Sequence, residues 1–198
     1  MKIHRYVTTS RAEGPGNRFV IWTQGCPIHC PGCFNRALQD EDGGTSIDEA
    51  SMIRLLDEAI CSQETSDPLT GLTLLGGEPF FQAAPLARVA AFAQEKGLNV
   101  ITFTGYTYEY LQGPEAPRDA HALLQVTDVL IDGPFKEDES SLERPLVGSA
   151  NQRFLFLTNR LSMQDFQPNQ YEIKIEKDGS IRINGMGHMN QLMRLVKE

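Results

Sequence analysis

Short apolar runs alternate along the chain with segments whose apolar residues recur every three or four positions. The short runs have the length and composition of buried strands, and the other segments have the period of amphipathic helices. The expected strands cover residues 18–23, 71–75, 100–103 and 129–131. The expected helices cover residues 46–61, 84–96 and 118–126. This alternation of strand and helix predicts an α/β fold built on a parallel sheet.

Capping residues mark the ends of two of these helices. Ser46 is expected to cap the first helix, and Glu49 three residues later completes a capping box. Gly97 is expected to end the second helix in a left-handed conformation. Further strands are expected over residues 2–9 and 154–157.

The last forty or so residues have a different pattern. Tyr171–Glu176 and Ser180–Ile183 alternate with a period of two on either side of Asp178-Gly179, which predicts a β-hairpin. A short helix over residues 190–197 is expected to close the chain.

Each expected parallel strand is followed by a glycine-containing loop with polar residues. In parallel sheets, ligands bind at the carboxyl ends of the strands. We therefore expect these loops to meet at one edge of the sheet and to form a site there. They are the cysteine loop 26–35, Gly76–Pro79, Thr104–Tyr106 and Asp132–Phe135.

Three cysteines, Cys26, Cys30 and Cys33, form a C-x3-C-x2-C pattern in the first of these loops. Thiolates gathered at one locus indicate a metal centre. Three thiolates can hold three irons of a four-iron cube and leave the fourth iron open, unlike the four-cysteine sets of ordinary clusters. Zinc held with His29, and redox or structural thiols, are the alternatives. Cys61, on the first expected helix, is interpreted as a structural or incidental thiol.

Composition and charge restrict the class of protein. The chain has 198 residues, 40% of them hydrophobic, and a net charge of −8, which disfavours a nucleic-acid surface. It contains no apolar run of 18 residues, so no membrane span is expected. Its N-terminus lacks the apolar core of a signal peptide, and its four cysteines are too few and too crowded for a disulfide framework. These features favour a cytoplasmic protein with reduced thiols.

The loop motifs, taken together and in order, resemble those of the anaerobic ribonucleotide reductase activating enzymes, which are small radical S-adenosylmethionine proteins. The resemblance covers about residues 13–160. The Pro-Gly pair before Cys33 is the form seen in these activases, although it leaves no aromatic residue there to contact the adenine. The motifs are Gly14-Pro15-Gly16-Asn17-Arg18, Cys26–Asn35, Gly76–Pro79, Thr104–Tyr106, Asp132–Phe135 and Gly148-Ser149-Ala150-Asn151-Gln152-Arg153.

This resemblance implies a fold and a domain organisation. The family has a partial, open β/α barrel, which residues 1–160 would form as a radical S-adenosylmethionine core domain. Residues 161–198 would be a C-terminal β-hairpin and helix extension packed on that core.

The resemblance also implies two cofactors and the residues that bind them. Cys26, Cys30 and Cys33 would hold a [4Fe-4S] cluster, and S-adenosylmethionine would bind at its open iron. Gly76, Gly77, Glu78 and Pro79 would lie along the methionine part of the cofactor, with Glu78 accepting from its ammonium group. Thr104 is a candidate for the ribose. Asp132, Ser149 and Asn151 are candidates for the ribose or the carboxylate.

The implied reaction is radical cleavage of S-adenosylmethionine followed by abstraction of a hydrogen atom. The expected partners are a glycyl radical enzyme, whose glycine would be the substrate, and an electron donor of the flavodoxin or ferredoxin type. No catalytic residue is expected beyond the cluster ligands, since no acid or base is needed. Two alternatives remain: a radical enzyme acting on a small molecule or peptide, and a non-catalytic iron–sulfur or zinc binding module.

Overall fold

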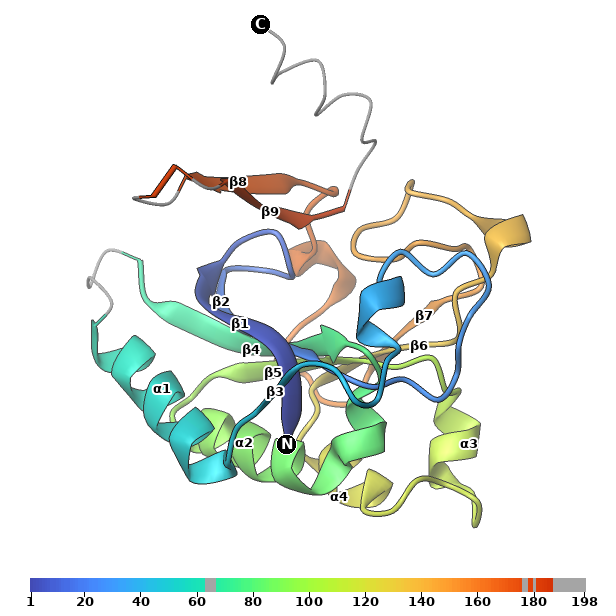
Figure 1. Ribbon diagram of the computed structural model, residues 1–198, viewed down its shortest axis with the longest axis horizontal. Helices are drawn as coiled ribbons and strands as arrows, with labels where there is room; N and C mark the ends of the chain where they lie inside the picture. Colours follow the sequence, from blue (N-terminus) through green and yellow to red (C-terminus); the bar gives the residue numbers. More distant parts are fainter. Residues whose placement is uncertain (63–66, 176–177, 180, 187–198) are drawn as a thin grey trace, which may run out of the picture.

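The computed structural model describes residues 1–62, 67–175, 178–179 and 181–186. Its strands form one seven-stranded sheet and one two-stranded sheet (Figure 1). In spatial order, the large sheet contains β3 (Thr45–Ser46), β1 (Lys2–Ser10), β2 (Asn17–Thr23), β4 (Leu69–Gly76), β5 (Asn99–Phe103), β6 (Val129–Asp132) and β7 (Arg153–Phe156).

The centre of the large sheet is parallel, which confirms the predicted α/β class. Strands β2, β4, β5 and β6 are parallel neighbours in that order. The two margins are antiparallel: β1 pairs with β2 on one side, and β7 pairs with β6 on the other. The sheet is therefore mixed, and the carboxyl ends of its four parallel strands lie along one edge.

The helices cover one face of this sheet. Figure 1 places α1, α2 and α4 together below the strands. The helices are α1 (Glu49–Ser62), α2 (Ala83–Glu95), α3 (Tyr108–Gln112) and α4 (Ala120–Gln125). The short 3-10 helices are η1 (Arg36–Leu38), η2 (Pro79–Gln82), η3 (Glu137–Glu139) and η4 (Met163–Asp165). Among the described residues, no helix has the length and apolar character needed to cross a bilayer.

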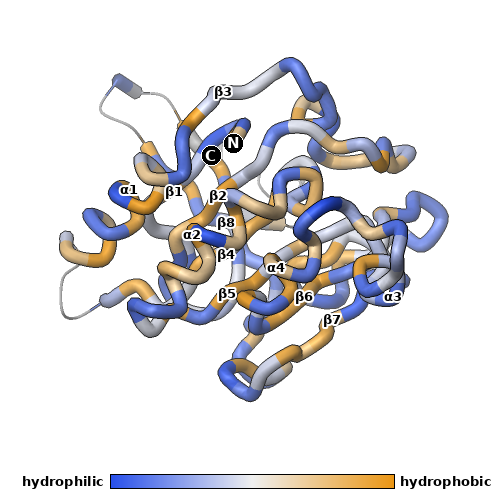
Figure 2. The backbone as a smooth tube through the Cα atoms, turned by 90° about the horizontal axis from the view of Figure 1, so that it is seen from below, coloured by the Kyte–Doolittle hydropathy of each residue, from blue (hydrophilic) through white to orange (hydrophobic). Residues whose placement is uncertain are grey.

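Alternate residues of each central strand face the helices. Phe19 and Ile21 of β2, together with Leu72 and Leu74 of β4, are fully buried in the cluster that includes α1, α2 and α4. Ile101 lies in a second cluster on the opposite face. Because both faces of these strands are covered, they read as continuous apolar runs in the sequence (Figure 2).

The predicted cap of the first helix is wrong, and so is its first turn. Ser46 pairs with Lys2 in β3, so its backbone is extended rather than capping. Asp48 takes the capping role, and its carboxylate accepts a hydrogen bond from Ser51 N–H at 2.8 Å. The helix consequently begins at Glu49. The predicted end of α2 is confirmed, since Gly97 has a φ of +87°.

The predicted hairpin is confirmed in the part of it that the structure describes. Strands β8 (Tyr171–Ile175) and β9 (Ile181–Gly185) pair antiparallel and lie over the sheet face opposite the helices (Figure 1). Lys174 Nζ donates to Thr9 O at 2.7 Å, which attaches the hairpin to β1. The helix expected over residues 190–197 lies outside the described residues.

A buried carboxylate also attaches the hairpin to the sheet. Glu13 is 6% exposed, and its Oε1 accepts from Gly185 N–H at 3.0 Å. The pKa of Glu13 is raised to about 7, mainly by burial and to a lesser extent by Glu172, while the hydrogen bond from Gly185 and the positive charge of Arg5 oppose the rise. Since the folded-state pKa exceeds the unfolded one, Glu13 takes up a proton on folding. Its contribution to stability is present in full below about pH 4.5 and is lost as the pH rises through about 7.

We therefore expect Glu13→Gln to stabilise the protein at about pH 8.5 by about 2 to 3 kcal/mol, and to have little effect at about pH 5. Glutamine keeps the acceptor for Gly185 but does not ionise. The measurement is urea unfolding of both proteins at the two pH values and at equal cluster content. An equal stability difference at both values would contradict the assignment of the titration to Glu13.

Candidate active site

The cysteine loop is closed at its base by hydrogen bonds between its two ends. Gly25 N–H donates to Leu38 O at 2.9 Å, and Cys26 N–H donates to Gln39 O at 3.3 Å. The Gln24 side chain donates to two further carbonyl groups at the far end of the loop. These contacts fix the loop that carries all three cysteines of the motif. The sequence did not single out Gln24, whose only signal is a polar residue at the end of an apolar strand.

Backbone N–H groups surround the sulfurs of the motif. Asn35 N–H approaches Cys33 Sγ at 3.4 Å. Burial raises the pKa of Cys26 and of Cys30, and backbone N–H groups directed at each of these two sulfurs oppose the rise. Such hydrogen bonds to sulfur are among the features that tune iron–sulfur clusters. The loop therefore offers three partly buried sulfurs, each with an N–H donor beside it.

Two kinds of metal centre were expected for these thiols, a single zinc ion and an iron–sulfur cluster. In the described part of the chain, no group of three or more His, Cys, Asp or Glu side chains is arranged to hold one metal ion. A zinc site requires all its ligands around one ion, whereas each thiolate of a four-iron cube binds a different iron. His29, the additional ligand in the zinc hypothesis, belongs to no such group. The three thiolates match the number of irons that a cube with one open iron presents to the protein, so the donor set fits a cluster.

The Gly76–Pro79 loop packs directly against the cysteine loop. Gly77 N–H donates to Thr23 O, and Glu78 N–H donates to Gly25 O, both at 2.9 Å. A Cβ atom on Gly77 would lie 2.3 Å from Gly25 O, so only glycine permits this approach. Gly76 has a φ of +112°, a conformation that also favours glycine. The two loops with the strongest motifs thus meet backbone to backbone.

Glu78 connects this loop to the next one. Its buried carboxylate accepts hydrogen bonds from Phe80 N–H, Thr104 Oγ1 and Gly105 N–H, each at 2.9 Å. Burial raises the pKa of Glu78 to about 7, and the three hydrogen bonds oppose this rise. Oε2 accepts only the bond from Gly105 among these, so it retains capacity for another donor. The expected role of Glu78 at the cofactor's ammonium stays a prediction, and its observed role is to join the ends of β4 and β5.

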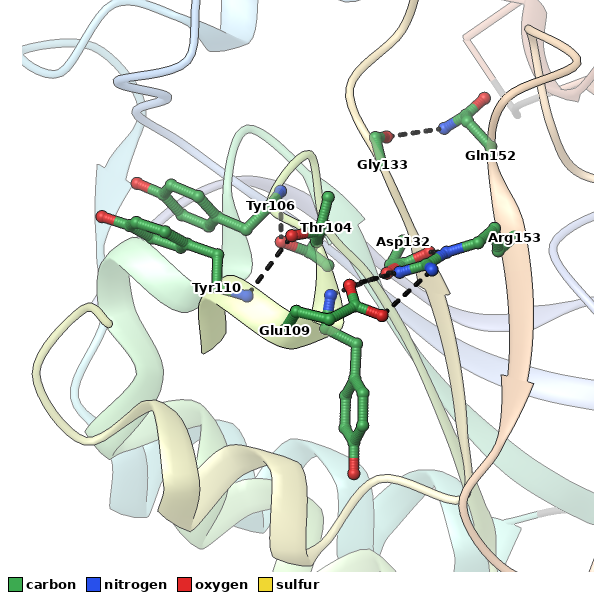
Figure 3. Close-up of polar contacts among 10 residues, drawn as sticks. Thr104, Tyr106, Glu109, Tyr110, Asp132, Gly133, Gln152 and Arg153 are labelled. Atoms are coloured by element: carbon green, nitrogen blue, oxygen red, sulfur yellow. Dashed lines mark hydrogen bonds and ion pairs between the residues drawn. The ribbon is translucent and has the colours of Figure 1, made fainter. Parts of the chain in front are cut away.

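Asp132 is held by a forked ion pair at the end of β6 (Figure 3). Arg153 contacts its two oxygens through Nε at 2.9 Å and Nη2 at 2.5 Å, and Tyr108 N–H donates to Oδ2 at 2.7 Å. The same guanidinium contacts Glu109 at 2.8 and 3.1 Å. Most of the acceptor capacity of Asp132 is therefore used within the protein. Its assignment to the cofactor stays a prediction.

The last two predicted residues, Ser149 and Asn151, precede Arg153 in the chain and differ in how many of their polar atoms have hydrogen-bond partners. Ser149 is buried, and its Oγ accepts from Lys136 N–H at 3.2 Å. Asn151 donates through Nδ2 to Pro134 O at 2.8 Å, while its buried Oδ1 has no hydrogen-bond partner within the described protein. A buried carbonyl oxygen without a partner calls for a donor. Asn151 Oδ1 therefore fits a hydroxyl or ammonium group of a bound cofactor.

Comparison with known proteins agrees with this site. Residues 12–155 match a family described as a 4Fe-4S single cluster domain. An anaerobic ribonucleoside-triphosphate reductase-activating protein of Pasteurella multocida is 31% identical over 159 residues, which cover 77% of this chain and 95% of that relative. The chain belongs to the family of glycyl radical enzyme activases.

Two further relatives show the range of this activase family. The anaerobic ribonucleoside-triphosphate reductase-activating protein of Escherichia coli K12 is 29% identical over 77% of this chain and 96% of its own length. A pyruvate formate-lyase-activating enzyme of Listeria monocytogenes is 30% identical over 66% of this chain, which spans about half (51%) of that enzyme. The chain is accordingly an enzyme, an oxidoreductase of the radical S-adenosylmethionine activating type with a 4Fe-4S cluster domain.

Proposed function

We propose that this enzyme uses a [4Fe-4S] cluster on Cys26, Cys30 and Cys33 to cleave S-adenosylmethionine and to abstract a hydrogen atom from a glycine of a partner glycyl radical enzyme. The observation that carries the proposal is the contact between the cysteine loop and the Gly76–Pro79 loop. At this contact, hydrogen bonds from Gly77 to Thr23 O and from Glu78 to Gly25 O join the loop that carries the three cysteines to the end of β4.

Held by Cys26, Cys30 and Cys33, the cluster would supply one electron, received from an external donor, for reductive cleavage of the S–C5′ bond of S-adenosylmethionine. The protein's own residues bind and orient. We assign Gly76, Gly77 and Pro79 to the methionine part, with Oε2 of Glu78 accepting from the ammonium group. Thr104, Asp132, Ser149 and Asn151 complete the pocket for the ribose and carboxylate, and Asn151 Oδ1 is the acceptor best placed to receive a donor.

The proposed function also implies an interpretation of the fold. We propose that residues 1–160 form an open, partial β/α barrel and that residues 161–198 extend it. The four parallel strands with helices on one face support this. An open sheet leaves room for a segment of a macromolecular substrate. We place the enzyme in the cytoplasm, where thiols stay reduced, and expect a flavodoxin- or ferredoxin-type electron donor.

The names of the relatives supply the candidate partners: an anaerobic ribonucleoside-triphosphate reductase and a pyruvate formate-lyase. The test incubates the reconstituted enzyme with each candidate, S-adenosylmethionine and a reductant, and records the electron paramagnetic resonance spectrum. We expect a glycyl radical doublet on one partner, which disappears when its glycine is replaced by alanine. Cofactor cleavage with no radical on either partner, but with turnover of an added peptide or small molecule, would favour the alternative substrate class.

A further inference from the structure

Exposed aromatic side chains mark three segments at the functional edge of the sheet. Phe34 is 66% exposed, Phe81 is 46% exposed and Tyr110 is 39% exposed. They follow β2, β4 and β5 in the chain, so each lies on a segment that leaves the carboxyl end of a parallel strand. Figure 1 shows the cysteine loop and α3, which carries Tyr110, at the same end of the sheet. We refer to these three side chains as the aromatic rim.

Phe34 comes directly after the third cysteine of the motif and is restrained although it is exposed. Its ring packs edge to face against the Phe135 ring, with the two centroids 5.1 Å apart. A Cβ atom on Gly148 would lie 2.9 Å from the Phe34 ring, so the glycine there makes room for it. A side chain that is already restrained loses less entropy when a partner covers it.

The other two members of the rim pack in a similar way. Tyr110 stacks on Tyr106, with ring centroids 5.0 Å apart and an angle of 17° between the ring planes (Figure 3). The Phe81 ring lies beside Gly25, the residue before Cys26, where an added Cβ would approach it at 3.3 Å. Aromatic residues are enriched at protein interfaces, and a few restrained ones carry most of the binding energy.

A hollow of about 470 Å³ adjoins the aromatic pair that includes Phe34. Pro31, which lies between the second and third cysteines, lines it together with residues 135–138. Lys136 is paired with Glu139 at 2.8 Å. The side chains at positions 137 and 138 are exposed carboxylates, which favour a partner that brings Lys or Arg to the hollow.

The position of the rim restricts what can cover it. Under the proposed function, the cofactor lies between the cysteine loop and Gly76–Pro79. A hydrogen atom moves only between groups in contact, so the protein that carries the substrate glycine must cover the loops around this place. An electron can cross a layer of protein, so an electron donor does not have to occupy this edge.

We propose that the aromatic rim and the hollow beside Phe34 form the docking surface for the partner glycyl radical enzyme. The segment that carries the glycine crosses the cysteine loop, with apolar residues against the rim and a Lys or Arg beside the hollow. The proposal rests on the proposed function, because the partner is the protein whose glycine is activated. It adds the surface on which that partner docks and the chemistry of the segment that fits it.

A matched set of variants tests the rim. Phe81→Ser and Tyr110→Ser are each expected to weaken binding of the intact partner about tenfold, because each removes an exposed aromatic contact. The probe is the reductase or the lyase, whichever the wild-type chain activates. Phe156→Ser is the control. Phe156 is 38% exposed and pairs with Val129 at the opposite end of β6, so this variant is expected to bind like the wild type.

Two further variants test the hollow and the ring beside it. Gly148→Ala displaces the Phe34 ring and is expected to weaken partner binding about threefold or more. Asp138→Lys is expected to weaken it about threefold, because the new charge repels a Lys or Arg of the partner. Glu58→Lys makes the same change of charge at an exposed position of α1 and is expected to leave the affinity unchanged.

A second measurement separates docking from the cofactor site. All assays use a chemical reductant, so that no electron-donor protein is present. For Phe81→Ser and Tyr110→Ser, activation of the partner at a fixed low concentration is expected to fall about tenfold more than cleavage of S-adenosylmethionine without partner. An equal fall in both rates would place the rim at the cofactor site and overturn the proposal. Wild-type affinity in both variants would also overturn it.

The remaining outcomes concern other occupants and the proposed function itself. Wild-type chain that forms no 5′-deoxyadenosine and activates neither partner overturns the proposed function, and the docking proposal with it. Variants that are normal with the chemical reductant but slow with a flavodoxin would assign the rim to the electron donor. A wild-type dimer that dissociates in Tyr110→Ser would assign it to a second copy. Either of these two results overturns the docking proposal alone.

Discussion

Gly77→Ala is expected to reduce 5′-deoxyadenosine formation to about 1% or less of the wild-type rate, equivalent to about 2.7 kcal/mol or more. The reason is steric. The added Cβ would lie 2.3 Å from Gly25 O and 3.0 Å from Leu38 O, and both are backbone atoms that cannot rotate away. The two loops must therefore separate. This lengthens the hydrogen bonds from Gly77 to Thr23 and from Glu78 to Gly25.

Gly113→Ala is the matched control. Gly113 follows α3 with a φ of −79°, and an added Cβ would lie no closer than 3.3 Å to another atom. We expect it to keep most of the cleavage rate and the full cluster content. The measurements are the cleavage rate and the iron and sulfide content of both variants after identical reconstitution. A Gly77→Ala enzyme with wild-type cluster content and rate would contradict the close packing of the two loops.

Arg18→Ala is expected to lower the free energy of unfolding by about 3 kcal/mol or more. Arg18 is fully buried in β2, and burial lowers its pKa to about 9. Its guanidinium donates to Thr73 Oγ1 at 2.6 Å, to Leu72 O at 2.7 Å and to Asn99 Oδ1 at 2.7 Å. Removing it leaves the buried acceptors Thr73 Oγ1 and Leu72 O without this donor, each at a cost of about 1 to 3 kcal/mol, and also removes the bond to the part-buried Asn99.

The contacts of Arg18 also explain a turn and a glycine beside it. Its Nη1 donates to Pro15 O at 3.1 Å, which holds the Gly14–Asn17 turn against the sheet. A Cβ on Gly71 would lie 2.2 Å from Nη1, so the neighbouring strand must carry a glycine there. The Gly14–Arg18 motif is thus a turn fixed by a buried arginine.

Arg88→Ala is the control for this prediction. Arg88 forms an exposed ion pair with Glu49, and such pairs contribute about 0 to 1 kcal/mol. Chemical denaturation of the three proteins at equal cluster content gives the comparison. Arg18→Met replaces the buried cation by an apolar side chain. If this variant proved as stable as the wild type, the free-energy cost of burying the guanidinium would equal the stabilisation from its hydrogen bonds.

The sequence predicted the parallel part of the sheet and the edge at which its loops meet, because both depend on local patterns. Apolar runs of strand length and helical periodicity specify the elements, and parallel order brings the loops after β2, β4, β5 and β6 to one edge. The cysteine spacing and the Gly76–Pro79 motif needed no long-range information. The hairpin was equally local, since alternation around Asp178-Gly179 predicts its pairing.

Features that depend on pairs of distant residues were not predictable in this way. The sequence shows only an arginine within an apolar run. It does not reveal that the hydrogen-bond partners of Arg18 lie on β4 and at Asn99. The ion pair of Asp132 with Arg153 joins β6 to β7, so an apparent ligand residue is largely occupied within the fold. The start of α1 was misplaced for the same reason, because pairing with β1 keeps Ser46 extended.

The most direct test of the central claim is product analysis after anaerobic reconstitution with iron and sulfide. The wild-type enzyme, reduced in the presence of S-adenosylmethionine, is expected to form 5′-deoxyadenosine and methionine. Cys30→Ala is expected to form none, and Cys61→Ala, which changes the exposed thiol on α1, is expected to match the wild type. Stoichiometric zinc in place of iron, or product formation that survives in Cys30→Ala, would contradict the account.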